Sequence, residues 1–167
     1  MSSLVDQKEK QSIFDDLLVR SRGRLAAVAG AYAPEDADDL LQEILMQIWR
    51  SLSTFKGDSS IDTWSYRVAI NTSLTWRRTK SRRKKRIPSE PSDLNELPTT
   101  VDGHDPAHLL DQFLQTLSKK DRALVLLYLD DLSGKEMAEV TGMSEGSVRV
   151  RIHRIRQKLA QWKVGDQ

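Results

Sequence analysis

The sequence predicts an all-α protein built from two small helical domains joined by a flexible linker. Apolar residues recur at helical spacing in both halves of the chain, and no strand-like alternation is sustained anywhere. Between the halves lie four prolines, at positions 88, 91, 98 and 106, among small polar residues. With 167 residues, 38% of them hydrophobic, the chain can bury two modest cores. We therefore expect domains at 8–87 and 107–163 and a linker at 88–106.

The first domain is expected to begin with two amphipathic helices separated by Pro34. Leu17 and Leu25 keep the spacing of one helical face, and the segment 40–49 repeats that pattern. Asp36 is expected to cap the second helix, where neighbouring acidic residues suit the positive end of the helix dipole.

The third helix is expected to follow a loop at 55–60 and to run to about Arg83, with Asp62 or Thr63 as its cap. Eight of the ten residues in 77–86 are Lys or Arg. Such a cluster suits the phosphates of a duplex, and the release of counterions would make that binding strongly salt-dependent. The alternative interpretation is a solvated run of charge.

The second domain is expected to hold helices near 107–117, 119–130, 133–140 and 144–162. The last two have the spacing of a helix-turn-helix, in which Gly142 permits the turn and Ala138 is small where the helices cross. The residues expected to face inward are Met143, Val148, Ile152 and Ile155.

The opposite face of the last helix is expected to enter a DNA major groove. This face holds Arg149, Val150, His153 and Arg154. Arginine pairs bidentately with guanine or holds phosphates, and Ser144 and Ser147 can cap the helix or contact a phosphate. The alternative is that helix-turn-helix is a common packing unit whose basic residues only complement the helix dipole.

Charge and composition exclude several classes of protein. The net charge of +2 hides a segment, 87–118, that has six acids and no Lys or Arg. The absence of cysteine excludes disulfides, thiol nucleophiles and cysteine-bound metals, and it fits a cytoplasmic protein. No signal peptide or membrane span is evident, so we expect a soluble, unprocessed protein without membrane insertion.

Three ordered motifs resemble the extracytoplasmic-function group of sigma factors in the sigma-70 family. The segment 36–44 resembles the polymerase-binding helix of that group, and Trp49 with Phe55-Lys56-Gly57 continues it. The segment 63–71, followed by Arg77 and Arg78, resembles the promoter-melting segment. The segment 137–149 resembles the helix-turn-helix, so the resemblance covers roughly residues 10–160.

The resemblance implies the roles of individual residues. Asp39, Gln42 and Glu43 would meet the coiled coil of the largest subunit of core RNA polymerase. The residues at the opened minus-10 element would be Phe55, Trp64, Arg67, Asn71, Arg77, Arg78, Arg82 and Arg83. There an unpaired base can stack on an aromatic ring while an amide reads its edge. The minus-35 element would be read by Ser144, Ser147, Arg149, Val150, His153 and Arg154. A purely structural role stays open for Trp64, Tyr66 and the exposed acids.

The implied partners are core RNA polymerase, promoter DNA and an anti-sigma factor, with no cofactor and no catalysis by the chain itself. The acidic linker could enter basic polymerase channels as a mimic of nucleic acid. A stand-alone helix-turn-helix regulator is the rival hypothesis, although it does not need the segments 39–43 and 64–71. A metalloenzyme is disfavoured, because Pro106 interrupts His104 and His108 and no third ligand is evident.

Overall fold

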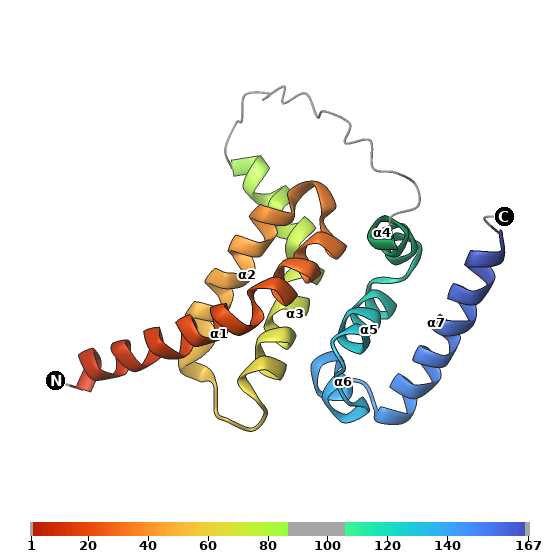
Figure 1. Ribbon diagram of the computed structural model, residues 1–167. Coiled ribbons are helices and arrows are strands. Elements are labelled where there is room, and N and C mark those ends of the chain that lie inside the picture. Colours follow the sequence, from red (N-terminus) through yellow and green to blue (C-terminus); the bar gives the residue numbers. More distant parts are fainter. Residues whose placement is uncertain (1, 87–105, 166–167) are drawn as a thin grey trace.

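The computed structural model of the protein describes residues 2–86 and 106–165, and every regular element in these ranges is helical. The elements are α1 (Ser2–Tyr32), the short 3-10 helix η1 (Pro34–Asp36), α2 (Ala37–Ser51), η2 (Leu52–Thr54), α3 (Ile61–Arg86), α4 (Pro106–Thr116), α5 (Lys119–Leu129), α6 (Gly134–Thr141) and α7 (Glu145–Gly165). Figure 1 shows α1–α3 as one bundle and α4–α7 as a second. The predicted all-α class is confirmed. The predicted linker lies outside the described residues, apart from Pro106 at the start of α4.

The first bundle forms because each of its helices buries one apolar stripe. Leu17 and Leu25 of α1, Leu40 and Ile44 of α2, and Ala69 of α3 are all at most 1% exposed. Removing such side chains from water contributes about 25 cal/mol per Å² of apolar surface. The helices are therefore held mainly by tertiary packing, as the spacing of their apolar residues predicts.

The start of α2 differs in detail from the prediction. Asp36 occupies the N-cap position, but its side chain makes no capping hydrogen bond. Its backbone N–H instead donates to the carbonyl of Ala33 at 3.0 Å, which closes the 3-10 turn before α2. The turn at Pro34 thus organises the entry into the helix, and the predicted side-chain cap was wrong.

The cap of α3 was also predicted wrongly. The hydroxyl of Ser60 accepts a hydrogen bond from the backbone N–H of Thr63 at 3.0 Å, so Ser60 is the capping residue. Asp62 lies inside the helix and faces α1, where its carboxylate accepts from Ser21 at 2.7 Å and from Arg20 at 3.2 Å. The helix starts slightly earlier than expected, which turns Asp62 from a cap into a link between α1 and α3.

The second bundle is packed around α5. Leu114 of α4, Leu124 and Leu127 of α5, and Val148 of α7 are at most 2% exposed. The rings of Phe113 and Trp162 lie 5.7 Å apart between centroids and join α4 to α7. This packing fixes the direction in which α7 presents its outer face.

The turn between α6 and α7 has the predicted geometry. Gly142 is left-handed, with φ +69°, and its N–H donates to the carbonyl of Ala138 at 2.9 Å. Ser133 and Glu136 form a capping box at the start of α6. At the start of α7 the hydroxyl of Ser144 accepts from the N–H of Ser147 at 3.2 Å. These contacts confirm the predicted helix-turn-helix.

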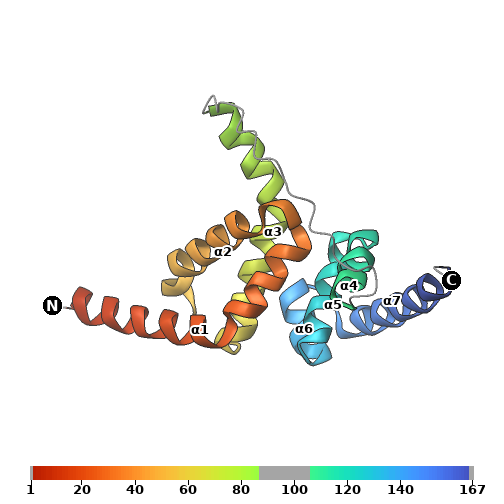
Figure 2. The ribbon, with the colours of Figure 1, turned by 45° about the horizontal axis from the view of Figure 1, so that its top comes forward.

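The two bundles are in contact. Helix α1 packs against α4 and α5, and α3 packs against α6. Figures 1 and 2 place α7 on the side of the second bundle that faces away from α1–α3. None of the helices in the two described ranges combines the length and apolar character that a membrane crossing requires.

Candidate nucleic-acid interface

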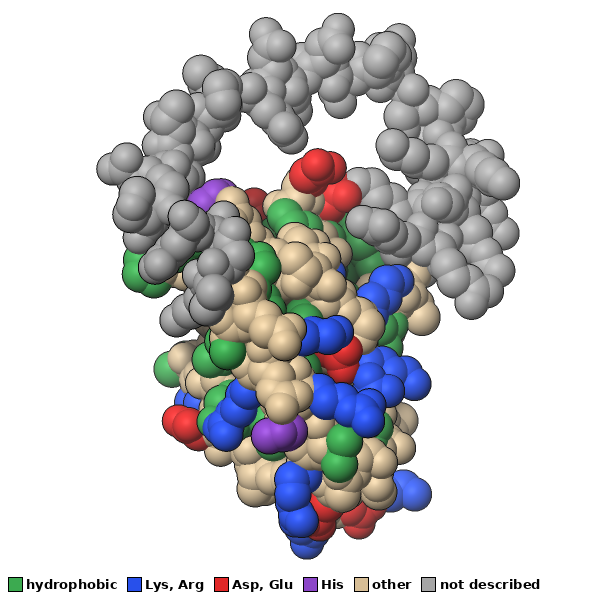
Figure 3. All heavy atoms as spheres, turned by 90° about the vertical axis from the view of Figure 1, so that its right-hand side faces the viewer, with side chains coloured by type: hydrophobic (Ala, Val, Ile, Leu, Met, Phe, Trp, Pro, Cys, Tyr) green, Lys and Arg blue, Asp and Glu red, His purple; other side chains and the backbone are tan. Residues whose placement is uncertain are grey.

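The outer side of α7 presents the face that the sequence predicted. Arg149, Val150, His153 and Arg154 are all exposed, with Val150 at 50%. Val148 and Ile155 lie on the opposite side and are buried. Figure 3, which views this side of the molecule, shows Lys and Arg side chains spread over its lower part among hydrophobic side chains and some acids. We call the four exposed residues Arg149, Val150, His153 and Arg154 the α7 face.

Two other arginines of α7 contact side chains of α5 at the surface. Arg151 donates to the carboxylate of Asp121 at 2.8 Å, and Arg156 stacks over the ring of Tyr128 with 4.9 Å to its centroid and also donates to its hydroxyl. Neither arginine was among the residues predicted to face the DNA. At 100° per residue they flank the buried stripe from opposite sides, and this phase is the signal that separates them from Arg149 and Arg154. The two arginines brace α7 against α5.

A second exposed stripe runs along α3. Arg67, Asn71 and Thr75 are four residues apart and are all exposed, so they share one face of the helix. The α3 stripe continues toward the basic end of the helix. That end holds Arg77, Arg78, Arg82 and Arg83, whose side chains lie outside the described set. Among the described side chains, an exposed amide and an exposed guanidinium thus share one face of α3.

Trp64 does not present a stacking surface in this structure. Its indole is 6% exposed and packs against the ring of Phe55, with 5.4 Å between centroids and 53° between planes. Phe55 itself is half-buried. Of the two roles that the sequence left open for Trp64, the structure gives it the core role.

The acidic face of α2 contains two of the three expected residues. Asp39 and Gln42 are exposed, whereas Glu43 is 6% exposed and accepts a hydrogen bond from Gln47 at 2.9 Å. The expectation that Glu43 offers an exposed carboxylate was wrong, because its place on the helix turns it toward the bundle. Met46, one turn beyond Gln42 and 40% exposed, completes this face. Sequence reasoning missed Met46, although its i+4 spacing from Gln42 was visible.

An apolar groove of about 410 Å³ adjoins this acidic face. It is lined by Phe14, Leu45, Met46, Trp49 and Arg50. The ring of Trp49 meets Phe14 edge-on at 5.2 Å and carries the ammonium of Lys10 at 4.6 Å from its centroid. The α1–α2 surface therefore combines acid, amide and exposed apolar side chains, which is the chemistry of a protein-binding surface.

The described residues contain no cluster of three or more His, Cys, Asp or Glu side chains arranged to hold a metal ion. His108 bonds to Gln112 at 2.9 Å. His104, its predicted partner in the disfavoured metal hypothesis, lies outside the described residues.

Both bundles match known families. Residues 17–83 match the family described as Sigma-70 region 2, and residues 107–159 match Sigma-70, region 4. The chain is 31% identical to the ECF RNA polymerase sigma-E factor of Escherichia coli, across 92% of this chain and 87% of that protein. It is 30% identical to the RNA polymerase sigma-E factor of Streptomyces coelicolor, across 95% of this chain and 86% of that protein.

Solved structures show the same fold. The sigma factor RpoE from Bartonella quintana, in complex with the anti-sigma factor NepR, is similar with a TM-score of 0.69 at 22% identity, over 92% of this chain and 98% of that one. CnrH, in complex with the cytosolic domain of CnrY, is similar with a TM-score of 0.69 at 24% identity, over 94% and 91%. The matches to two sigma regions and to relatives along nearly the whole length show that the chain belongs to the extracytoplasmic-function group of the sigma-70 family of RNA polymerase sigma factors.

Proposed function

We propose that this sigma factor divides promoter recognition between two rigid helices, with α7 reading the minus-35 duplex and α3 capturing the opened minus-10 strand. The observation that carries the proposal is the presence of two separate exposed faces, one on each helix and each backed by a packed core. In this proposal the polymerase, and not the sigma factor, catalyses RNA synthesis. The protein acts where polymerase and chromosome meet, in the cytoplasm.

The α7 face supplies the groups that duplex reading requires. Arg149 and Arg154 can each reach a guanine edge or a phosphate, and His153 lies between them on the exposed side. A bidentate arginine–guanine pair contributes about 1–3 kcal/mol of discrimination against a wrong base. Ser144 and Ser147 already bond to each other at the start of α7, which leaves them close to any phosphate at the helix N-terminus.

The α3 stripe supplies the groups for an unpaired strand. Asn71 presents an amide that can bond to a base edge, and Arg67 lies one turn before it. The basic end at 77–86 continues along the same helix and suits the phosphates of the adjoining duplex. Phe55 and Trp64 would contribute a stacking platform only after they part.

Core polymerase is proposed to bind the exposed face of α2. Asp39 and Gln42 supply polar contacts, and Met46 with the neighbouring groove supplies apolar area. Glu43 is buried and accepts a hydrogen bond from Gln47, one turn further along the same helix. Because the sigma factor RpoE is solved in complex with the anti-sigma factor NepR, we also propose that an anti-sigma protein binds this chain.

The proposal is tested by transcription with purified core RNA polymerase on fragments of the genome that encodes the protein, followed by sequencing of transcript starts. Starts that appear only with the protein and share upstream elements are expected. Asn71→Ala and Arg154→Ala should each lower them about 5- to 150-fold, which corresponds to about 1–3 kcal/mol.

Matched controls separate a site effect from general damage. Gln7→Ala removes an exposed amide and Arg22→Ala an exposed cation from α1, far from both reading faces, and neither should change the starts. Binding of the protein to duplex DNA in the absence of polymerase, with no binding to core polymerase, would instead favour a stand-alone regulator.

A further inference from the structure

Val150 is an apolar side chain at the centre of the α7 face. Among the described residues of α7 it is the large hydrophobic side chain that stays exposed, at 50%. At about 100° per residue it points about 160° away from Val148 and about 140° away from Ile155, both of which are buried. Val150 therefore lies opposite the buried stripe of the helix, where core packing does not account for a valine.

The residues around Val150 on the helix surface are small or polar. One turn before it lie Gly146 and Ser147, and one turn after it lie His153 and Arg154, all of them exposed. A methyl group placed on Gly146 would meet no other atom within 4 Å, so the space beside Val150 is open. A protein-docking surface needs a contiguous apolar patch, and one valine among these neighbours does not supply it. The face instead suits a partner that is polar almost everywhere and apolar at one point.

The major groove of DNA is a partner of this kind. The edges of the base pairs present hydrogen-bond donors and acceptors there, and the C5-methyl group of thymine is the apolar group among them. An isopropyl group placed over a donor or an acceptor deprives it of water without offering a new hydrogen bond, which is unfavourable. Placed on the thymine methyl group, the isopropyl group removes apolar surface from water on both sides of the contact. An apolar side chain at the centre of the face therefore favours thymine.

The dimensions of the helix and the groove bring Val150 to the base edges. A helix with its side chains is about 10–12 Å across and the major groove is about 12 Å wide, so the centre of the outer face meets the base edges. In a helix-turn-helix the N-terminal part of the second helix contacts the bases, and Val150 lies in the second turn of α7. Arg149 and Arg154 lie on either side of Val150 and can reach guanine edges or phosphates.

Contacts on both flanks of α7 fix the direction in which Val150 points. On one flank Arg151 donates to Asp121 at 2.8 Å, and on the other the guanidinium of Arg156 lies 4.9 Å from the centroid of the Tyr128 ring. Both partners belong to α5, so they oppose rotation of α7 about its axis. A valine in a helix has one strongly preferred rotamer, so it loses little conformational freedom when it packs against a base.

We propose that Val150 is a specificity-determining residue that selects a thymine in the minus-35 element by packing on its C5-methyl group. This assignment rests on the proposed function and gives one side chain of the α7 face one chemical feature of the duplex to read. Arg149 and Arg154 bind polar groups of the duplex, whereas Val150 binds a methyl group. Truncation of Val150 should therefore relax the choice of base at one position and leave the rest of the element unchanged.

The first arm of the test selects duplexes from a random pool with holoenzyme assembled from core RNA polymerase and the full-length protein. The wild type should enrich one position in thymine. Val150→Ala should lose that thymine and keep the bases whose enrichment depends on Arg154. Because Val150 is half exposed, its truncation leaves the core of the second bundle intact.

Two further variants control for the chemistry of the change. Val19→Ala removes the same two methyl groups from an 87% exposed valine of α1, and it should leave the enriched thymine in place. Val150→Ile keeps a branched apolar side chain and should also keep the thymine. Loss of the thymine with Val19→Ala would overturn the assignment to Val150.

The second arm changes the methyl group of the base alone. Deoxyuridine in place of the selected thymidine removes the methyl group and keeps the base pair, and it should lower initiation by the wild type about fourfold, the effect of one methyl group in an apolar contact. 5-Methylcytosine in place of cytosine at that position should raise initiation by a similar factor. With Val150→Ala both changes should have less than about a twofold effect, because a double-mutant cycle isolates the contact between the two groups.

The possible outcomes separate the thymine contact from the proposed function. Enrichment of an element that depends on Arg154, without a thymine methyl group that depends on Val150, would overturn the contact and leave the proposed function standing. A methyl preference that survives Val150→Ala would overturn it as well, because another residue must then bind the methyl group. A holoenzyme that enriches no element would refute the proposed function and the thymine contact together.

Discussion

Arg122 is a buried cation held by three backbone carbonyls at the C-terminal ends of two helices, α1 and α4. It is 9% exposed, and its guanidinium donates to the carbonyls of Leu114, Leu117 and Ala31. Carbonyls at helix C-termini carry partial negative charge, so a guanidinium suits them without a full ion pair.

Replacement of Arg122 should destabilise the protein more than any nearby surface change. Arg122→Ala leaves buried carbonyls without donors, and we expect a loss of about 2–4 kcal/mol in the free energy of unfolding, measured by urea titration. Lys120→Ala, on the exposed side of the same helix, should stay within about 0.5 kcal/mol of the wild type. A small effect at Arg122 would mean that water readily reaches those carbonyls.

Glu136 makes the stability of the α6 cap depend on pH. The Ser133 hydroxyl, followed by its backbone N–H, lowers the pKa of Glu136 below the usual 4.5. A carboxylate with a lowered folded-state pKa stabilises the fold above its unfolded pKa, and this contribution is lost as pH falls through the folded-state value.

Glu136→Gln should therefore destabilise the protein slightly at neutral pH and have less effect in acid. Unfolding of both proteins followed from about pH 7 to about pH 3 checks the convergence. Glu139→Gln, an exposed change on the same helix, should lack this pattern. If the free energies of unfolding of the two proteins differ by a constant amount across that pH range, the charge of the Glu136 carboxylate does not stabilise the cap.

At the scale of the element, α7 must be held against α5 if its outer face is to be fixed in position. Arg151 and Asp121 are partly exposed, with side chains 39% and 14% exposed, so their coupling should be modest. A double-mutant cycle with Arg151→Ala and Asp121→Ala should give about 0.5–1 kcal/mol of coupling in unfolding.

Arg154→Ala should show the complementary behaviour. Removal of this exposed side chain should weaken binding to promoter duplex without changing the free energy of unfolding. Arg151→Ala should instead lower the free energy of unfolding. Coupling near zero between Arg151 and Asp121 would remove the bracing role.

Alanine substitutions at Gly142 and Gly146 test the backbone conformation of the turn between α6 and α7 and of the first turn of α7. A methyl group at either position would meet no other atom within 4 Å, so the effect of Ala is conformational in both cases. Gly142 has φ +69°, and Gly142→Ala should cost about 1 kcal/mol. Gly146 lies in the first turn of α7, where Gly146→Ala should gain up to about 0.5 kcal/mol. Thermal unfolding should therefore move in opposite directions, and equal shifts would contradict the left-handed turn.

At the scale of the whole molecule, the contact between the two bundles depends on the length of chain that joins them. A flexible Gly-Ser insert that doubles the segment 87–105 raises the entropy cost of closure by only about 0.6 kcal/mol. We expect the fraction of molecules in which the two bundles are apart, measured by energy transfer between labels on α1 and α7, to rise about threefold. A much larger rise would show that the native segment itself helps to hold the bundles together.

The sequence alone determined which segments are helices, where the helix-turn-helix lies and which side of α7 faces out. Gly142, the buried stripe of Val148 and Ile155, and the exposed Arg149 and Arg154 were all predicted, because helical phase and turn chemistry are local properties of a few neighbouring residues.

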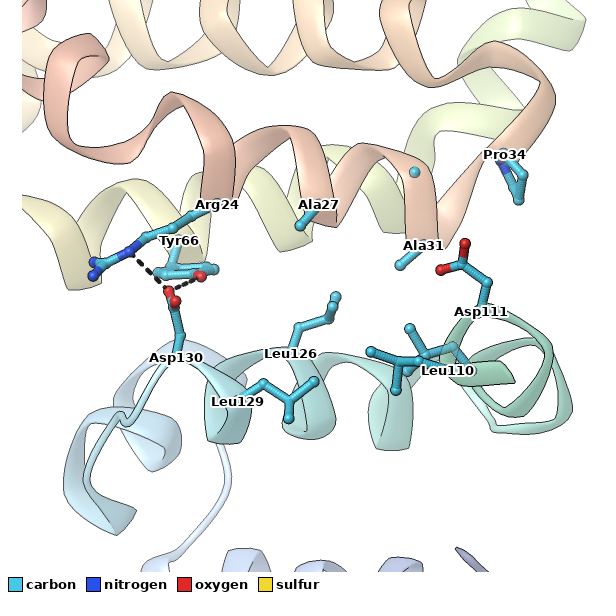
Figure 4. Close-up of a pocket in the computed structure, with 12 residues that line it drawn as sticks. Arg24, Ala27, Ala31, Pro34, Tyr66, Leu110, Asp111, Leu126, Leu129 and Asp130 are labelled. Atoms are coloured by element: carbon cyan, nitrogen blue, oxygen red, sulfur yellow. Dashed lines mark hydrogen bonds and ion pairs between the residues drawn. The ribbon is translucent and has the colours of Figure 1, made fainter. Parts of the chain in front are cut away.

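Only the tertiary structure decided what each side chain does once elements meet. In the folded protein Glu43 and Trp64 are buried. Asp62 contacts α1, and Arg151 pairs with Asp121. Asp130 contacts Arg24 and Tyr66 across the two bundles (Figure 4). Each of these outcomes depends on a partner that lies far away in the sequence or on the side from which a neighbouring helix approaches. The spacing of apolar residues cannot predict the direction from which a neighbouring helix approaches, because it describes only one helix at a time.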